Sequence, residues 1–183
     1  MAEEVAVWRA LEGLAEEVGA HLVGTGEGCR DLYDAIGEPD DLLAEHERLF
    51  VGPGPVTCPP YESFWREDVP VDIRRSLMGP CTAELHSLYG ELGLTVSTVV
   101  GDLPDHVAIE LEALAFALSS EATWPVARTL FAGHLRHFVP RLCRALAKES
   151  ELAYYSRLAG LTAAWLAPLE RHLAALSEPA REC

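Results

Sequence analysis

Apolar side chains return every three or four residues along most of this chain. In the first segment, about residues 3–20, they are Val7, Leu11, Leu14 and Val18. An α-helix turns once every 3.6 residues, so this spacing puts one apolar stripe on one helix face. The same period predicts helices over about residues 40–50, 80–92, 102–118, 123–146 and 149–176, with a helical turn or two at 29–36.

Local residues indicate where three of these helices begin. Pro39 and Pro80 each stand at the start of an apolar-periodic segment. Proline fits the first turn of a helix because the N–H group that it lacks has no partner there. Asp102 is a candidate N-cap for the helix over 102–118, and Asp105 follows it in the manner of an imperfect capping box.

The segment from Val51 to Pro70 is predicted to be a long loop. Its prolines are Pro53, Pro55, Pro59, Pro60 and Pro70. Proline removes a backbone donor, so neither a helix nor a central strand is expected to persist there. Long loops without secondary structure are usually either functional or disordered. The aromatic residues Tyr61, Phe64 and Trp65 argue against disorder in this one. Such rings either fold back into the core or line a groove for an apolar peptide.

Two further features complete the predicted fold. Pro140 lies inside the apolar stripe of the helix over 123–146 and is expected to kink or split it. Only Thr95 to Val100 has a strand-like pattern, and one short strand cannot form a sheet. The sequence therefore predicts an all-α protein, a single-domain bundle of about eight helices over residues 1–183 with one long Pro/Gly-rich loop.

Composition is compatible with this fold and limits the location of the protein. The chain has 183 residues, of which 49% are hydrophobic. That length suits one domain with a substantial core. No apolar run reaches the roughly 18 residues that span a membrane, and the N-terminus has no basic, then apolar, secretory pattern. The five cysteines form no CxxC pair, which favours reduced thiols over a disulfide framework. We therefore expect a cytoplasmic protein without stable membrane insertion.

The charge of the chain favours cationic partners over nucleic acid. The formal net charge is −15, whereas nucleic acid needs a cationic surface. The acidic surface either attracts a cationic peptide or simply maintains solubility. Between Glu121 and Glu149 there is no acid, and the cations there are Arg128, Arg136, Arg141, Arg144 and Lys148. This basic segment either pairs with acidic neighbours inside the fold or offers a patch to an anionic ligand.

No arrangement of residues supplies a recognised catalytic or metal site. His134 and His137 are three residues apart on the predicted basic helix, a spacing that some metal sites use. No acid lies nearby in the sequence, which favours interhelical or surface histidines. Glu110 and Glu112 are two apart on a helix and diverge. The chain also lacks the GxSxG, P-loop and GxGxxG patterns. We therefore expect no enzyme, no cofactor and no metal site.

Four separated segments resemble, in order, the TorD/DmsD/NarJ-type chaperones, the redox enzyme maturation proteins. The first runs from Glu45 through Leu49-Phe50-Val51-Gly52-Pro53-Gly54 to Pro59-Pro60-Tyr61-Glu62-Ser63, and the second is Leu103-Pro104-Asp105-His106 with Ile109-Glu110-Leu111-Glu112. The third is Phe131, His134, Leu135, Pro140 and Leu142, and the fourth is Tyr154-Tyr155, Leu158-Ala159 and Leu161-Thr162. The departures are small: His46 replaces a common aromatic residue, Phe138 a common tryptophan and Leu103 a common acid.

The resemblance implies a cytoplasmic, all-helical chaperone for a molybdenum- or tungsten-containing oxidoreductase. Such proteins bind the twin-arginine signal peptide of the catalytic subunit, or its remnant. They assist cofactor insertion and prevent premature export, as in anaerobic respiration. The peptide-binding region of the family corresponds here to Tyr61, Glu62, Ser63, Trp65, Pro104, Asp105 and His106.

Two other functions stay open on the sequence. One is a small helical hydrolase of a phosphorylated small molecule, with the basic segment holding phosphate and His134 or His137 acting in catalysis. The other is a structural metal-binding protein. Long helices joined by Pro/Gly hinges also allow either a monomer or a domain-swapped dimer.

Overall fold

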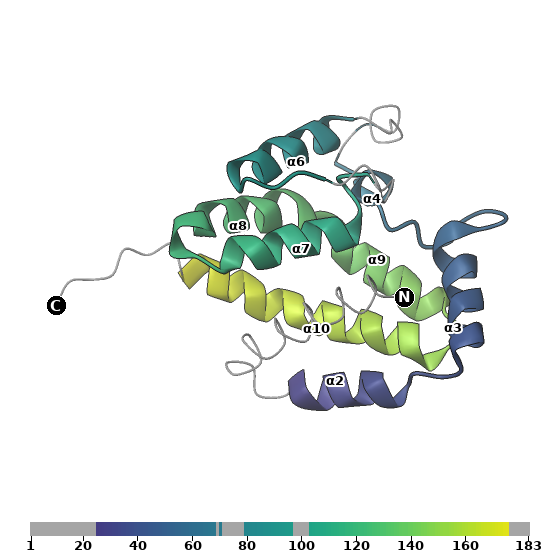
Figure 1. The fold of residues 1–183 in the computed structure, drawn as a ribbon. Helices are drawn as coiled ribbons and strands as arrows, with labels where there is room; N and C mark the ends of the chain where they lie inside the picture. The colour runs from purple at the N-terminus through teal and green to yellow at the C-terminus, as the bar shows by residue number, and fades with distance from the viewer. Residues whose placement is uncertain (1–24, 69, 71–78, 97–102, 176–183) are drawn as a thin grey trace.

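The computed structural model describes residues 25–68, 70, 79–96 and 103–175. These residues form an all-helical fold (Figure 1), as predicted, with seven helices when adjoining segments are joined and no strand. The segments are α2 (Thr25–Asp34), α3 (Pro39–His46), η1 (Glu47–Val51), α4 (Glu62–Trp65), α6 (Pro80–Glu91), α7 (Val107–Leu118), η2 (Glu121–Thr123), α8 (Trp124–Leu130), η3 (Phe131–Leu135), α9 (Arg136–Glu149) and α10 (Ala153–Ala175). The helix predicted over 3–20 and most of the strand-like run at 95–100 lie outside the described residues.

The long helices α9 and α10 form the centre of the arrangement and pack side by side (Figure 1). The short turn between them, Ser150–Leu152, makes them antiparallel. α2 packs on α10, α7 packs on α8, and α6 lies beyond α8. The side chains buried completely between these layers include Leu85, Leu114, Leu130, Leu135 and Phe138. All of these except Leu130 lie on an apolar stripe that the helical period identifies in the sequence.

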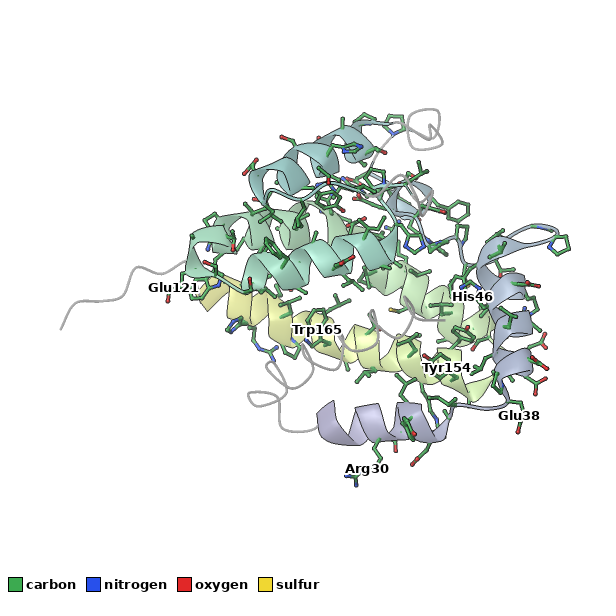
Figure 2. The ribbon with its side chains drawn as sticks, in the orientation of Figure 1. Arg30, Glu38, His46, Glu121, Tyr154 and Trp165 are labelled. Atoms are coloured by element: carbon green, nitrogen blue, oxygen red, sulfur yellow. The ribbon has the colours of Figure 1, made fainter. Side chains whose placement is uncertain are left out.

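Residues of the Glu45-to-Phe50 segment contact the chain at the start of α10. The buried Glu45 carboxylate accepts hydrogen bonds from Arg48 Nε (2.6 Å) and from the backbone N–H of Glu151 (2.6 Å). The Arg48 hydrogen bond lowers the pKa of Glu45. Phe50 meets Tyr155 edge to face at 5.6 Å, and Figure 2 shows the neighbouring Tyr154 and His46 at the same end of the molecule. The Glu45-to-Phe50 pattern therefore fastens α3 and η1 to α10.

Two of the three predicted helix starts are confirmed, and the third is wrong. Pro39 and Pro80 occupy the first turns of α3 and α6. The helix expected to begin after Asp102 begins instead at Val107. Its N-cap is His106, whose Nδ1 accepts a hydrogen bond from the backbone N–H of Ala108 (3.1 Å). An imidazole nitrogen performs here the role that the sequence suggested for an aspartate.

Of the two predicted effects of Pro140, the split does not occur, because α9 runs through this proline. The irregular turn lies earlier, where the π-helical segment η3 joins α8 to α9. A π-helical turn shifts hydrogen bonds by one residue and leaves carbonyl groups available to other donors. The Gly133 carbonyl accepts from Arg66 Nη1 (2.9 Å), and the Ala132 carbonyl contacts His137 Nε2 at 3.0 Å. The helix is therefore distorted where it meets a neighbouring segment.

The Pro-rich segment is a loop, as predicted, but it contains the single helical turn α4. Gly52, at φ 104°, ends η1 in a conformation that favours glycine. The loop then folds back on the helices, since the Cys58 N–H donates to the Leu49 carbonyl (3.0 Å). Trp65 Nε1 donates to the Pro59 carbonyl (2.7 Å). These contacts fix the position of the aromatic end of the loop.

The basic segment pairs in part with acids inside the fold, as one of its two interpretations predicted. Arg141 Nη2 lies 2.8 Å from Glu67, and Arg136 lies 3.8 Å from Glu170.

Cys58, Cys81 and Cys143 are buried free thiols. Within the described ranges, no helix has both the length and the apolar character to cross a membrane.

Candidate functional site

Backbone hydrogen bonds join the Pro-rich loop to the turn before α7. The Glu62 N–H donates to the Asp105 carbonyl (2.9 Å), and the Val107 N–H donates to the Pro60 carbonyl (2.8 Å). Together they form an isolated antiparallel bridge between Tyr61 and His106. The Tyr61 and His106 rings meet edge to face, with their centres 5.3 Å apart. Two segments more than 40 residues apart in the chain thus form one continuous surface.

Within this surface, the predicted site residues divide into accessible and buried groups. Tyr61, Ser63, Trp65 and His106 are half-buried, while Pro104, Asp105 and Glu62 are buried. Phe64 is 53% exposed and meets Trp65 edge to face. The accessible rings can therefore touch an apolar ligand in this conformation.

The buried residues instead make hydrogen bonds that fix the position of this surface. One Asp105 carboxylate oxygen accepts from the Ser63 N–H (3.2 Å), which holds α4 against the turn. The Pro104 carbonyl accepts from the hydroxyl group of Tyr89 (2.8 Å), which anchors the turn to α6. Burial raises the pKa of Tyr89, so its hydroxyl group stays protonated and donates this bond.

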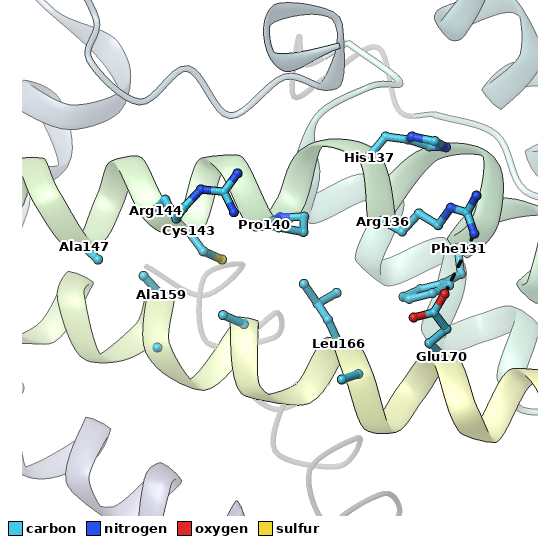
Figure 3. A pocket seen from close by; sticks show the side chains of 13 residues that line it. Phe131, Arg136, His137, Pro140, Cys143, Arg144, Ala147, Ala159, Leu166 and Glu170 are labelled. Atoms are coloured by element: carbon cyan, nitrogen blue, oxygen red, sulfur yellow. Dashed lines mark ion pairs between the residues drawn. The ribbon is translucent and has the colours of Figure 1, made fainter. Parts of the chain in front are cut away.

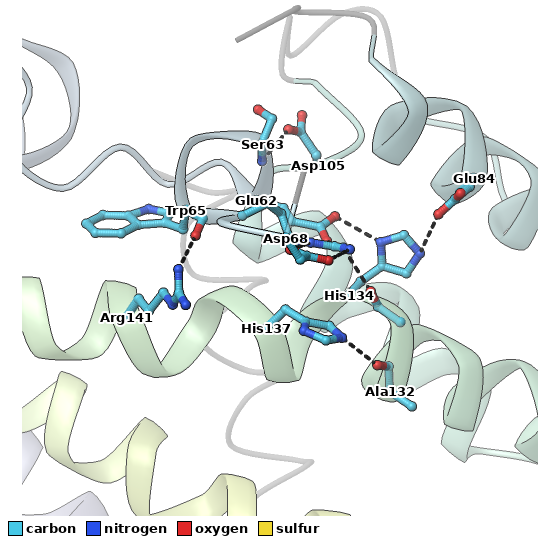
Figure 4. A network of polar contacts seen from close by, with 12 residues as sticks. Glu62, Ser63, Trp65, Asp68, Glu84, Asp105, Ala132, His134, His137 and Arg141 are labelled. Carbon is cyan, nitrogen blue, oxygen red and sulfur yellow. Dashed lines mark hydrogen bonds and ion pairs between the residues drawn. The ribbon is translucent and has the colours of Figure 1, made fainter. Parts of the chain in front are cut away.

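Glu62 is the centre of a polar network beneath the loop (Figure 4). One of its oxygens accepts from Arg66 Nη1 (2.5 Å), and the other lies 2.9 Å from His134 Nδ1 in η3. Glu62 and His134 are both buried. The network therefore connects α4 to the π-helical turn before α9.

Arg66 extends the network to the surface. Its guanidinium group makes two hydrogen bonds to the Asp68 carboxylate (2.6 and 2.5 Å), besides its bonds to Glu62 and Gly133. This two-pronged geometry is one that only arginine offers. The Arg66 hydrogen bond lowers the pKa of Asp68 to about 2.

Glu110 in α7 completes the group of buried ionisable side chains. Its carboxyl group is fully buried, and neither oxygen has a hydrogen-bond partner among the described residues. Burial first, and then the nearby charges of Glu62 and Asp105, raise the pKa of Glu110 well above its ordinary value. Donor atoms of Glu62, Glu110 and His134 all lie within 4.8 Å of one another. This convergence contradicts the expectation that His134 has no acid nearby.

Local sequence patterns indicate only part of this network. The expected interhelical position of His134 is confirmed, but its partner Glu62 lies 72 residues away. No local pattern singles out Arg66, and the spacing of Glu110 relates it only to Glu112. Glu110 lies on the apolar face of the helix over 102–118. Because a buried acid needs a partner, this position is the local sign of a buried polar network.

A separate cavity of about 580 Å³ lies between α9 and α10 (Figure 3). Its lining combines an apolar floor, including Phe131 and Leu166, with the charged Arg136, Arg144 and Glu170. None of the predicted peptide-binding residues lines it.

The family model described as nitrate reductase delta subunit matches residues 12–144. The chain therefore belongs to this family, which is of the NarJ/TorD chaperone type. This agrees with the resemblance that the sequence motifs indicate. A search of the curated proteins found no match.

Proposed function

We propose that this protein is a cytoplasmic chaperone in the maturation of a molybdenum- or tungsten-containing oxidoreductase. It binds the N-terminal twin-arginine leader of the catalytic subunit, or the remnant of that leader, until the cofactors are inserted. It thereby delays export and performs no chemistry itself. Membership of the nitrate reductase delta subunit family supports the class of client. The joined surface of Tyr61 and His106 is the observation that supports a peptide site.

The leader combines an apolar stretch with two arginines, and the surface offers partners for both. The apolar part packs on Phe64 and the half-buried Trp65. Rigid aromatic rings anchor a peptide at low entropic cost. Glu62 and Asp105 are buried, so they hold the loop in place rather than touch the peptide.

Exposed carboxylates lie around the loop, and two of them, Glu67 and Asp68, also pair with Arg141 and Arg66 of this chain. Glu67 and Asp68 follow α4 directly, and Glu84 projects from α6 beside His134. Their side chains are 70%, 48% and 68% exposed, respectively. Arginine binds carboxylates through paired hydrogen bonds, which also fixes the direction of the peptide.

Calorimetry with leader peptides from molybdoenzyme catalytic subunits tests the proposal. We expect Phe64→Ala to weaken binding of the matching peptide at least about fivefold, because an exposed anchor ring contributes more than about 1 kcal/mol. Phe116→Ala is the matched control: this ring on α7 is 46% exposed and lies outside the surface, so its loss should leave affinity unchanged. Equal affinities for both variants would place the peptide elsewhere. No binding of any leader to the wild-type protein would refute the peptide-binding function.

The hydrolase alternative receives no support from the two histidines that suggested it. His134 is buried and bonded to Glu62, and His137 Nε2 contacts the Ala132 carbonyl. The two side chains thus have separate partners.

A further inference from the structure

The three donor groups of Glu62, Glu110 and His134 come from three different parts of the fold. They belong to α4, α7 and the π-helical turn η3. Each is buried, and their donor atoms lie within 4.8 Å of one another. From this geometry we propose that Glu62, Glu110 and His134 bind a divalent transition-metal ion.

The separations match those of metal ligands. Two ligands at about 2.1 Å from an octahedral ion are about 3.0 Å apart when adjacent and about 4.2 Å apart when opposite. His134 Nδ1 and Glu62 Oε2 are 2.9 Å apart, the adjacent distance. The remaining distances lie within 4.8 Å, against about 4.2 Å for opposite ligands, so binding requires the Glu110 carboxylate to move slightly toward the ion.

Glu110 provides an independent indication of a ligand. Both of its oxygens are buried and lack a hydrogen bond to any described residue. A buried polar group without a partner costs about 1–3 kcal/mol, so native proteins seldom retain one without a reason. A bound cation satisfies this carboxylate and offsets the negative charges of Glu62 and Asp105, which face it.

The surroundings suit metal ligands in two further respects. Arg66 holds the Glu62 oxygen that is not used, and so fixes the orientation of this carboxylate. When Nδ1 of His134 binds a metal, the ring proton moves to Nε2. Nε2 lies 3.9 Å from the carboxylate of Glu84. Metal-bound histidines usually donate their second N–H group to such a carboxylate.

The donor types select the class of metal. Imidazole suits Zn²⁺ and carboxylates suit Mn²⁺ as well, whereas Mg²⁺ and Ca²⁺ prefer oxygen donors alone. Two carboxylates with one imidazole therefore fit Zn²⁺ or Mn²⁺. The bound ion would fasten α4, and with it the aromatic loop, to α7 and α9.

The full chain, freed of metal by a chelator, is titrated calorimetrically with ZnCl₂ and with MnCl₂. We expect one equivalent of at least one ion to bind, and Glu110→Gln to weaken that binding more than about 100-fold, since even an outer-shell change costs 10–100-fold. Glu112→Gln removes the same charge from an exposed position on the same helix and should leave binding unchanged. Equal binding by wild type and Glu110→Gln, or no stoichiometric binding of either ion, overturns the site.

A second measurement needs no variant and serves if Glu110→Gln does not fold. X-ray absorption spectroscopy of the zinc-loaded wild-type protein identifies the ligands of the ion. We expect oxygen donors and one imidazole at about 2.0–2.2 Å, and no sulfur. Sulfur ligands, or more than one imidazole, would overturn the site. Neither measurement involves a leader peptide, so the outcome is independent of the proposed chaperone function.

Discussion

At the scale of single residues, burial decides what each carboxylate does. Glu62 is buried but has two partners, Arg66 and His134. Asp105 is buried with one oxygen bonded to Ser63 N–H and the other without a described partner. Glu110 has no partner for either oxygen among the described residues. Because a low dielectric disfavours the charged form, Glu110 retains its proton to a higher pH than an exposed acid.

Replacing Glu110 by glutamine should therefore change how stability depends on pH. In the unfolded chain this carboxyl ionises near pH 4.5, whereas in the folded protein it ionises at a higher pH. Between these two values the folded state holds one more proton, so the free energy of unfolding falls as pH rises. We expect wild type to lose about 1.4 kcal/mol per pH unit relative to Glu110→Gln in that window.

Urea unfolding from about pH 4.5 to pH 8, in the presence of a chelator, measures this difference. The neutral glutamine cannot ionise, so the contributions of all groups that do not interact with Glu110 cancel between the two proteins. Glu112→Gln, at an exposed position, serves as the control and should follow the wild-type curve. Parallel curves for wild type and Glu110→Gln would contradict a raised pKa at Glu110.

At the scale of elements, Arg66 connects the loop helix α4 to the π-helical turn η3. Its side chain is 11% exposed and binds Glu62, Asp68 and the Gly133 carbonyl. The π-helical turn makes the last contact possible, because it leaves this carbonyl available. An irregular helix turn thus serves to hold a loop that has little regular structure of its own.

Truncating Arg66 should be among the most destabilising changes near the surface. Arg66→Ala leaves the buried Glu62 charge without its cation, which costs about 3–5 kcal/mol. Arg66→Lys restores the charge but not the two-pronged geometry, so we expect it to recover only part of this loss. Arg136→Ala should cost less than about 1 kcal/mol, since Arg136 is exposed and 3.8 Å from Glu170. Chemical unfolding measures all three, and a Lys variant as stable as wild type would show that charge alone suffices.

At the scale of the whole molecule, charge is distributed unevenly between the surfaces. The net charge is −15, yet Arg136 and Arg144 line the cavity between α9 and α10. Exposed acids such as Glu67 and Glu84 instead lie near the aromatic loop. A cationic leader peptide is therefore attracted to the molecule as a whole and to the loop region in particular.

Salt should weaken the binding of such a peptide through this attraction. Between about 50 and 500 mM NaCl the Debye length falls from about 14 Å to about 4 Å, which screens exposed carboxylates. We expect the affinity for a leader peptide to fall over this range. The same peptide with both arginines replaced by glutamine should show a much smaller decrease, when both are measured by calorimetry. Equal salt dependence would mean that the arginines contribute no charge interaction.

The sequence by itself determined the helical fold, the long loop and the family. These follow from local information: a 3.6-residue period, prolines such as Pro39 and Pro80, and short motifs such as Glu45 to Phe50. It also identified the two segments, around Tyr61 and His106, that the structure joins. Local patterns show which face of a helix is buried but not which helix covers that face.

Only the tertiary structure decided which residues of these two segments are accessible to solvent and which are buried under the surface that they form. Glu62, Glu110 and His134 are separated by up to 72 residues, and their meeting depends on how α4, α7 and η3 pack. The same packing buried Asp105 and made His106 the N-cap of α7. Burial and charge pairing arise from neighbours distant in the chain, and no local spacing encodes them.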